Sequence, residues 1–147
     1  MESALDAGQA MQFLIAFTTL WILMCFALSL WGGWWQLTDR YRGTPSKAAA
    51  KWRFESASMR RMAAYPGCLK FSIGREGLGI SILFLFRVGH PPLLVPWTDI
   101  TAHELESLVI KKVRLNFAKE PDVPLTISLK LARQIRDTSP AYWNLDF

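Results

Sequence analysis

The chain has 147 residues, of which 51% are apolar and 20% are charged, and its formal net charge is +5. That length suits one domain of ordinary size. The apolar fraction is high for a fully soluble domain and low for a protein made only of membrane helices, so the composition favours one membrane span followed by one water-facing domain. The two cysteines, Cys25 and Cys68, lie in different sequence surroundings, which predicts small buried thiols and no disulfide framework.

An uncharged apolar stretch at residues 13–35 predicts a transmembrane helix. Its 23 residues would extend about 34 Å as a helix, and a hydrocarbon core is about 30 Å thick. Tryptophans crowd its C-terminal end, where indole rings prefer the headgroup layer. Residues 1–12 carry two acids and no bases, the wrong sign for a signal peptide, so we expect an uncleaved anchor.

The charges around this stretch predict its orientation. Residues 38–61 contain seven Lys and Arg against two acids. Because Lys and Arg gather on the cytoplasmic side of a span, we expect a short extracytoplasmic N-terminus and a cytoplasmic C-terminal part. The basic charge then belongs to the membrane surface, and no nucleic-acid partner is expected.

Residues 36–51 are predicted to form a basic juxtamembrane connector. Gly43 and Pro45 interrupt any continuation of the membrane helix, and Thr44 is placed to cap a short helical turn running through the alanines that follow. Basic side chains near an anionic membrane surface are attracted to it. The candidates for contact with anionic lipid in this region are Arg40, Arg42, Lys47 and Lys51.

From residue 52 to residue 147 the pattern is that of strands. The tetrapeptide GREG at 74–77 predicts a tight hairpin, and no helix follows it, which excludes a dinucleotide-binding loop. Residues 80–86 are apolar on both faces, so another element must pack on them. We expect a helix at 128–139 to be that element. The fold class is therefore α+β: a transmembrane helix, then about six strands in a small antiparallel sheet or open barrel closed by a C-terminal helix.

Two segments carry a resemblance to a known group of proteins. LVPWTDI (94–100) is similar to a segment that enters a sheet strand in the pleckstrin-homology-like domains of bacterial membrane proteins. The block FRVGHPPLLVPW (86–97), with YPGCL and GLGIS before it, resembles uncharacterised bacterial single-span proteins. The resemblance implies a barrel plugged by the closing helix and a place in the inner (cytoplasmic) membrane, and it implies no catalytic residues.

The block FRVGHPPLLVPW allows two interpretations. The double proline and Gly89 suit a rigid connection in which Arg87 and His90 bond to nearby carbonyls or to carboxylates such as Asp99. Alternatively, Arg87 and His90 form a polar pocket for an anion such as a lipid phosphate. Of the two, the sequence favours the rigid connection.

Other chemistry finds little support in the sequence. The two histidines, His90 and His103, are far apart, neither cysteine lies at ligand spacing, and no nucleophile motif occurs, so we expect no metal, no cofactor and no catalytic site. The first functional hypothesis is a non-catalytic accessory or scaffolding subunit that docks on a membrane protein complex; the alternative is an anionic-lipid sensor. Aromatic candidates for partner binding are Trp31, Trp34, Trp35, Tyr142, Trp143 and Phe147.

Overall fold

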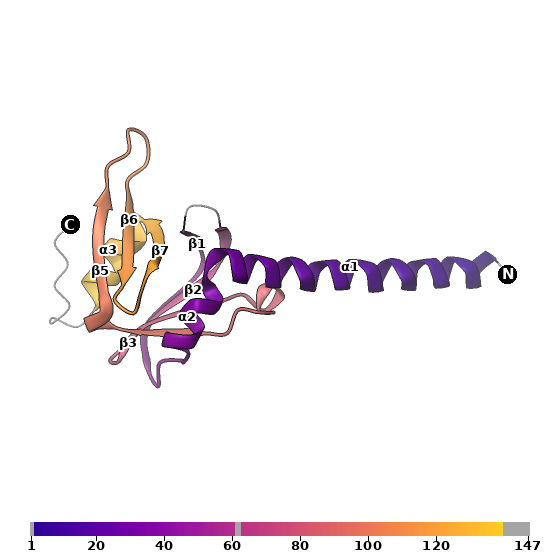
Figure 1. Ribbon diagram of the computed structural model, residues 1–147, viewed down its shortest axis with the longest axis horizontal. Helices are drawn as coiled ribbons and strands as arrows, with labels where there is room; N and C mark the ends of the chain where they lie inside the picture. The colour runs from indigo at the N-terminus through magenta and orange to yellow at the C-terminus, as the bar shows by residue number, and fades with distance from the viewer. Residues whose placement is uncertain (1, 61–62, 140–147) are drawn as a thin grey trace.

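The computed structural model describes residues 2–60 and 63–139, and it shows an α+β protein with a long N-terminal helix (Figure 1). Helix α1 (Glu2–Gly32) extends away from the rest of the molecule for most of its length. Within Asp6–Gly32 a window of 18 residues has a mean hydropathy of 2.3, and only 11% of that window is buried. α1 is therefore long and apolar enough to cross a membrane, a test that a signal sequence would also pass.

The predicted helix at 13–35 is correct in type and wrong in its bounds. α1 begins near the N-terminus and ends at Gly32, because Gly33 adopts a left-handed backbone conformation with φ of 84°. A second helix, α2 (Trp34–Tyr41), then starts in a new direction. The first part of the predicted connector is thus helical, and Trp34 lies in α2 and not in the long helix.

The predicted helical turn after Thr44 is absent, because strand β1 (Ala48–Met59) begins where the alanines lie. β1 pairs with β2 (Ala63–Gly74), and its register shifts at several places between Ala48 and Ala57. Such irregularities bend a strand and add twist. They also explain why the alternation of residues 52–59 is weak in the sequence.

In the described residues seven strands form one antiparallel, open sheet in the order β4-β3-β2-β1-β7-β6-β5. β2 and β3 (Gly77–Ile82) are joined at the predicted hairpin, where Ile73 pairs with Leu78. β1 is the central strand, since it pairs with β2 on one side and with β7 on the other. The remaining strands are β4 (Leu93–Pro96), β5 (Ile100–Leu105), β6 (Lys112–Phe117) and β7 (Glu120–Ser128).

The apolar run at 80–86 is not one strand. β3 ends at Ile82, and Phe84–Phe86 form a short 3₁₀ turn (η1) whose side chains are largely exposed. The helix predicted at 128–139 is present as α3 (Leu129–Thr138), with Ser128 accepting a hydrogen bond from the Leu131 amide as its N-cap. However, α3 packs on β6 and β7, whereas α2 packs on β4 and β7. The expected cover of the run by α3 is therefore wrong.

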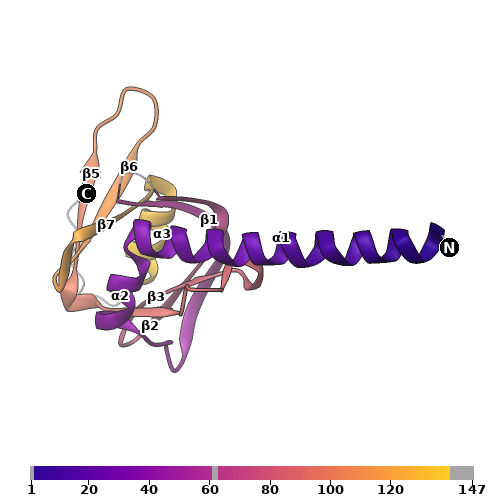
Figure 2. The ribbon, with the colours of Figure 1, turned by 45° about the vertical axis from the view of Figure 1, so that its right-hand side comes forward.

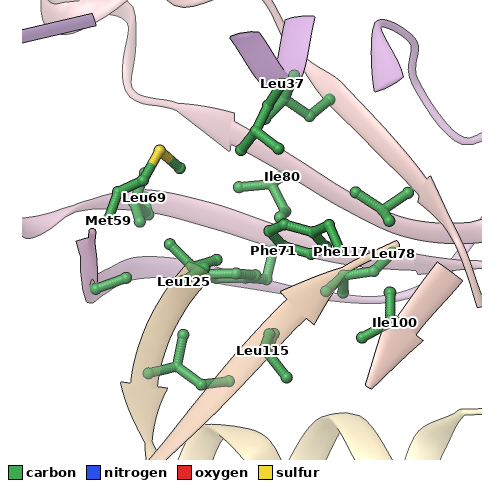
Figure 3. Packing of buried hydrophobic residues seen from close by; sticks show 14 of the residues in the cluster. Leu37, Met59, Leu69, Phe71, Leu78, Ile80, Ile100, Leu115, Phe117 and Leu125 are labelled. Carbon is green, nitrogen blue, oxygen red and sulfur yellow. The ribbon is translucent and has the colours of Figure 1, made fainter. Parts of the chain in front are cut away.

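One hydrophobic core joins all of these elements. The alternating residues of β6, Val113, Leu115 and Phe117, are buried as predicted. Leu37 of α2 points into the same core toward Ile80 (Figure 3). Every strand contributes to this cluster, so the half of the sheet around β3 and the half around β6 form a single packed unit.

Candidate functional site

A group of buried polar and aromatic side chains lies where α1, α2 and β2 meet the segment 83–92. Trp34, Tyr65 and His90, here called the junction cluster, form its centre. The ring of Trp34 lies 5.7 Å from that of Tyr65 and 5.2 Å from that of His90, and the Trp34 indole donates to the Pro91 carbonyl at 2.9 Å. Aromatic rings at such separations attract each other beyond their burial alone.

His90 is held by two hydrogen bonds that fix the tautomer of its neutral ring. Its Nδ1 lies 2.9 Å from the Val88 carbonyl, which can only accept, so Nδ1 carries the proton. Its Nε2 is then an acceptor and lies 3.2 Å from the Tyr65 hydroxyl, which donates to it. Burial lowers the pKa of His90 below its ordinary value, because a charged imidazolium is poorly solvated there. Burial likewise raises the pKa of the Tyr65 hydroxyl.

This arrangement predicts that acid destabilises the fold. The ordinary pKa of histidine is 6.5, and below that pH the unfolded chain binds a proton at His90 that the folded chain resists. The stability that the neutral His90 contributes to the fold should therefore be lost as the pH falls below about 6.5, until His90 is protonated in the folded chain as well. We expect His90→Gln to reduce this dependence in denaturant titrations of the detergent-solubilised protein at pH 7.5 and 5.5.

The matched control for that experiment is His103→Gln, since His103 is exposed on β5 and its replacement leaves the interior unchanged. The control should keep the loss of stability on acidification. An unchanged pH dependence in His90→Gln would contradict the assignment of a neutral, buried His90.

A small apolar pocket adjoins the junction cluster. Its volume is about 150 Å³, and both cysteines line it, which confirms the prediction that they are buried, free thiols. Burial raises the pKa of the Cys68 thiol, so it is kept in the unreactive, protonated form. Within the described ranges no group of three His, Cys, Asp or Glu side chains could hold a metal ion. The other lining residues are Met24, Leu28, Ala64, Tyr65, Pro66, Ile82, Phe86 and His90.

The structure does not bring the predicted pair Arg87 and His90 together as an anion pocket. Arg87 is exposed, whereas His90 is 2% exposed and faces the interior. Asp99, the expected carboxylate partner, instead lies 3.1 Å from the Tyr41 hydroxyl. His90 does bond to a nearby carbonyl, so the geometry fits the interpretation of this block as a rigid connection.

The predicted juxtamembrane bases spread over the surface. Arg40 is exposed and lies 3.5 Å from Glu120, and Arg42 and Lys47 are also exposed. Lys51 faces a groove of about 290 Å³ between β1 and β2, which it shares with Arg53 and Lys70. These last two bases were not singled out in the sequence, because only strand pairing places Lys70 beside the β1 residues.

The aromatic residues predicted to bind a partner also differ in their exposure. Trp31 is 80% exposed and Trp35 is 44% exposed, but Trp34 is fully buried and cannot meet a partner. Tyr142, Trp143 and Phe147 lie outside the described residues.

A second surface feature was missed in the sequence. The connection between β5 and β6 projects from the body of the molecule (Figures 1 and 2). At its tip Leu108, Val109 and Ile110 are 105%, 88% and 56% exposed. β6 begins at Lys112, so these three residues belong to the connection and not to a strand.

Comparison with known proteins leaves the site to be interpreted from its own geometry. No protein-family model matches the chain, and no curated protein is significantly similar to it.

Proposed function

We propose that this chain is a single-span inner-membrane protein whose cytoplasmic domain is a non-catalytic interaction module. The observation that carries the proposal is the exposure of α1. Phe13, Leu20 and Leu23 are 70%, 66% and 61% exposed, whereas the apolar helix of a soluble protein is buried in its core. A bilayer covers such a helix on all sides, and the basic residues that follow it favour a cytoplasmic domain.

Contacts near the end of α1 support a permanent anchor over a cleaved signal. The Trp21 indole donates to the Leu85 carbonyl at 2.9 Å, and the Ser29 hydroxyl donates to the Gly89 carbonyl. Cys25 and Ser29 are both buried against the domain. Cleavage after the apolar stretch would remove these contacts and expose the surface beneath them, so the helix is part of the fold.

A pleckstrin-homology-like identity of the domain is also a proposal. It is supported by seven strands that lead to a closing helix, and by the position of LVPWTDI, which forms β4, a short 3₁₀ turn and the start of β5. The Trp97 indole within it is buried and donates to the Gly74 carbonyl at 3.0 Å. This segment thus links the two ends of the open sheet.

The projecting tip at Leu108–Ile110 is the element that we assign to docking. Three adjacent exposed apolar side chains cost free energy in water, and such a patch marks a contact surface. The tether to the membrane confines the tip near the bilayer, so that even weak contacts with another membrane protein act at high effective concentration. The proposed partner is therefore a membrane protein or complex.

Purification in mild detergent tests this proposal. We expect the native chain to co-purify with a membrane protein in fixed proportion and the double variant Leu108→Asp, Val109→Asp to lose it, because charge at the tip opposes burial. The double variant Thr101→Asp, His103→Asp is the matched control, since it places the same two charges at exposed positions of β5 and should retain the partner. A native chain that elutes as a monomer without any membrane protein would contradict the proposal.

A second candidate function, binding of anionic lipid, is favoured by the groove that holds Lys51, Arg53 and Lys70. Thr44, Ser46, Ser72 and Ser81 also line it, and of these the Ser46 hydroxyl already donates to the Glu76 carboxylate. Cations with several hydroxyl donors suit a phosphate-bearing headgroup. Binding that depends on anionic lipid and weakens with salt would support this candidate, and equal binding to neutral vesicles would oppose it.

A further inference from the structure

Residues 83–89, here called the η1 loop, run alongside α1 and not away from it. The Leu85 carbonyl accepts from the Trp21 indole, and the ring of Phe86 lies 5.1 Å from the ring of Trp21. A Cβ placed on Gly89 would lie 3.1 Å from the ring of Phe26, so the loop is pressed against the helix along this stretch. In Figures 1 and 2 the loop is the part of the sheet domain that reaches furthest along α1.

The length of α1 fixes the depth of this loop, provided that α1 spans the membrane as proposed above. The last charge before the apolar stretch is Asp6. A span of about 20 residues is needed to cross the hydrocarbon, so it must continue at least to Phe26. Trp21 lies five residues before that point, or about 7 Å inside the hydrocarbon at 1.5 Å per residue. A span that began later along the chain would place Trp21, and the loop beside it, deeper still.

Several backbone groups of the η1 loop are paired within the protein, while the amides of Phe84, Leu85, Val88 and Gly89 have no partner among the described residues. The Leu83 amide donates to the Cys68 carbonyl at 2.8 Å, and the Phe86 amide donates to the Leu83 carbonyl at 2.9 Å. The carbonyls of Leu85, Val88 and Gly89 accept from the side chains of Trp21, His90 and Ser29. In water such pairing is not needed, whereas within a bilayer an unsatisfied backbone group is costly, so each of these hydrogen bonds lowers the cost of insertion.

The side chains of the η1 loop also suit the apolar interior of a bilayer. Phe84 and Leu85 are 79% and 68% exposed, and they lie next to the exposed apolar surface of α1 with no charged residue between Ser81 and Arg87. Arg87, which follows the turn, has a long flexible stem that can carry its guanidinium back to the headgroup phosphates. The exposed surface of α1 and that of the loop thus form one continuous apolar face.

From this geometry we propose that the η1 loop inserts into the acyl region of the bilayer beside α1, with Phe84 and Leu85 in contact with lipid chains. The domain then contacts the membrane at two places, the helix and the loop. Two contacts prevent the domain from swinging about the Gly33 turn, so the tip at Leu108–Ile110 is presented at a fixed orientation to the membrane plane. The junction cluster acts as the support that holds the loop against the helix.

Site-directed spin labelling of the full chain in lipid nanodiscs tests the proposal. Single cysteines replace Leu85 in the loop, Leu23 in α1 and Leu108 at the tip, in a background where Cys25 and Cys68 are changed to alanine. All three positions are exposed, so the labels do not disturb the core. Collisions with oxygen, which concentrates in lipid, are compared with collisions with a water-soluble nickel chelate.

We expect Leu85→Cys to resemble Leu23→Cys, with oxygen contact in excess of nickel contact, and Leu108→Cys to show the reverse. Phe84→Cys repeats the measurement in case the label at position 85 prevents folding. A lipid signal at 23 with a water signal at both 84 and 85 would overturn the insertion of the loop and leave the anchor in place. A water signal at 23 would instead overturn the membrane span on which the inference rests.

Discussion

Replacing Trp34 with alanine should cost about 3–5 kcal/mol of unfolding free energy, the range for large aromatic side chains removed from a core. Trp34 is fully buried, and its ring contacts both Tyr65 and His90. The change also removes the donor to the partly buried Pro91 carbonyl, and an acceptor that loses its partner adds to the cost. Since the same ring joins α2 to the segment that carries His90, we expect the η1 loop to detach from α1 before the sheet unfolds.

The neighbouring tryptophan provides the control. Trp35 is 44% exposed, so Trp35→Ala should cost less than about 1 kcal/mol, as most surface substitutions do. Denaturant titration of both variants in detergent, followed by near-ultraviolet circular dichroism, measures the difference. Limited proteolysis should cleave the Trp34 variant within 83–89 while the Trp35 variant resists. Equal losses in the two variants would mean that the junction cluster does not hold the domain to the helix.

Most strands of this fold can be predicted from the sequence because the residue pattern that specifies each of them lies within a short segment. In β6 the alternation of Val113, Leu115 and Phe117 with polar residues corresponds directly to the buried and exposed faces. The hairpin at Gly74 and Gly77 is equally local, since Ile73 pairs with Leu78 directly across the turn. Such constraints act within one strand or one turn, and a short window of sequence contains them.

The junction cluster depends on contacts that no short window contains. Tyr65 and His90 are 25 residues apart and meet only after β2 and the segment beyond β3 have taken their places. The sequence shows both residues but gives no sign of their pairing. β1 loses its regular alternation for the same reason, since its register shifts arise in the pairing with β2 and not from the β1 sequence alone.

One feature of the site could have been found. Trp34, Leu37, Thr38 and Tyr41 are the buried residues of α2, and their spacing of three and four is that of one helical face. The crowding of tryptophans suggested a headgroup layer instead, because Trp31, Trp34 and Trp35 were treated as equivalent. The glycine pair that precedes Trp34 separates them: Trp31 stays on the exposed long helix, and Trp34 turns into the core.

The turn at Gly33 should be the position least tolerant of a single added methyl group between the two helices. Its φ of 84° lies in the left-handed region, where a side chain costs about 1–2 kcal/mol. An added Cβ would also lie 2.7 and 2.8 Å from the two methyl carbons of Val123 on β7, and such overpacking costs about 1–3 kcal/mol more. We therefore expect Gly33→Ala to lower the unfolding free energy by about 2–5 kcal/mol.

Gly8→Ala is the matched control, because no atom lies within 4 Å of the added Cβ and the position is helical. It should leave stability unchanged or raise it by up to about 1 kcal/mol. The Gly33 variant can also be tested by the position of α1. Relief of the overlap with Val123 must move α1 away from β7. The contact between Trp21 and Leu85 should then change as well. A spin label at position 85 should then lose oxygen contact in Gly33→Ala and keep it in Gly8→Ala. Native stability in Gly33→Ala would show that the two helices can change their angle freely, and the domain would then not be held at one orientation to the membrane.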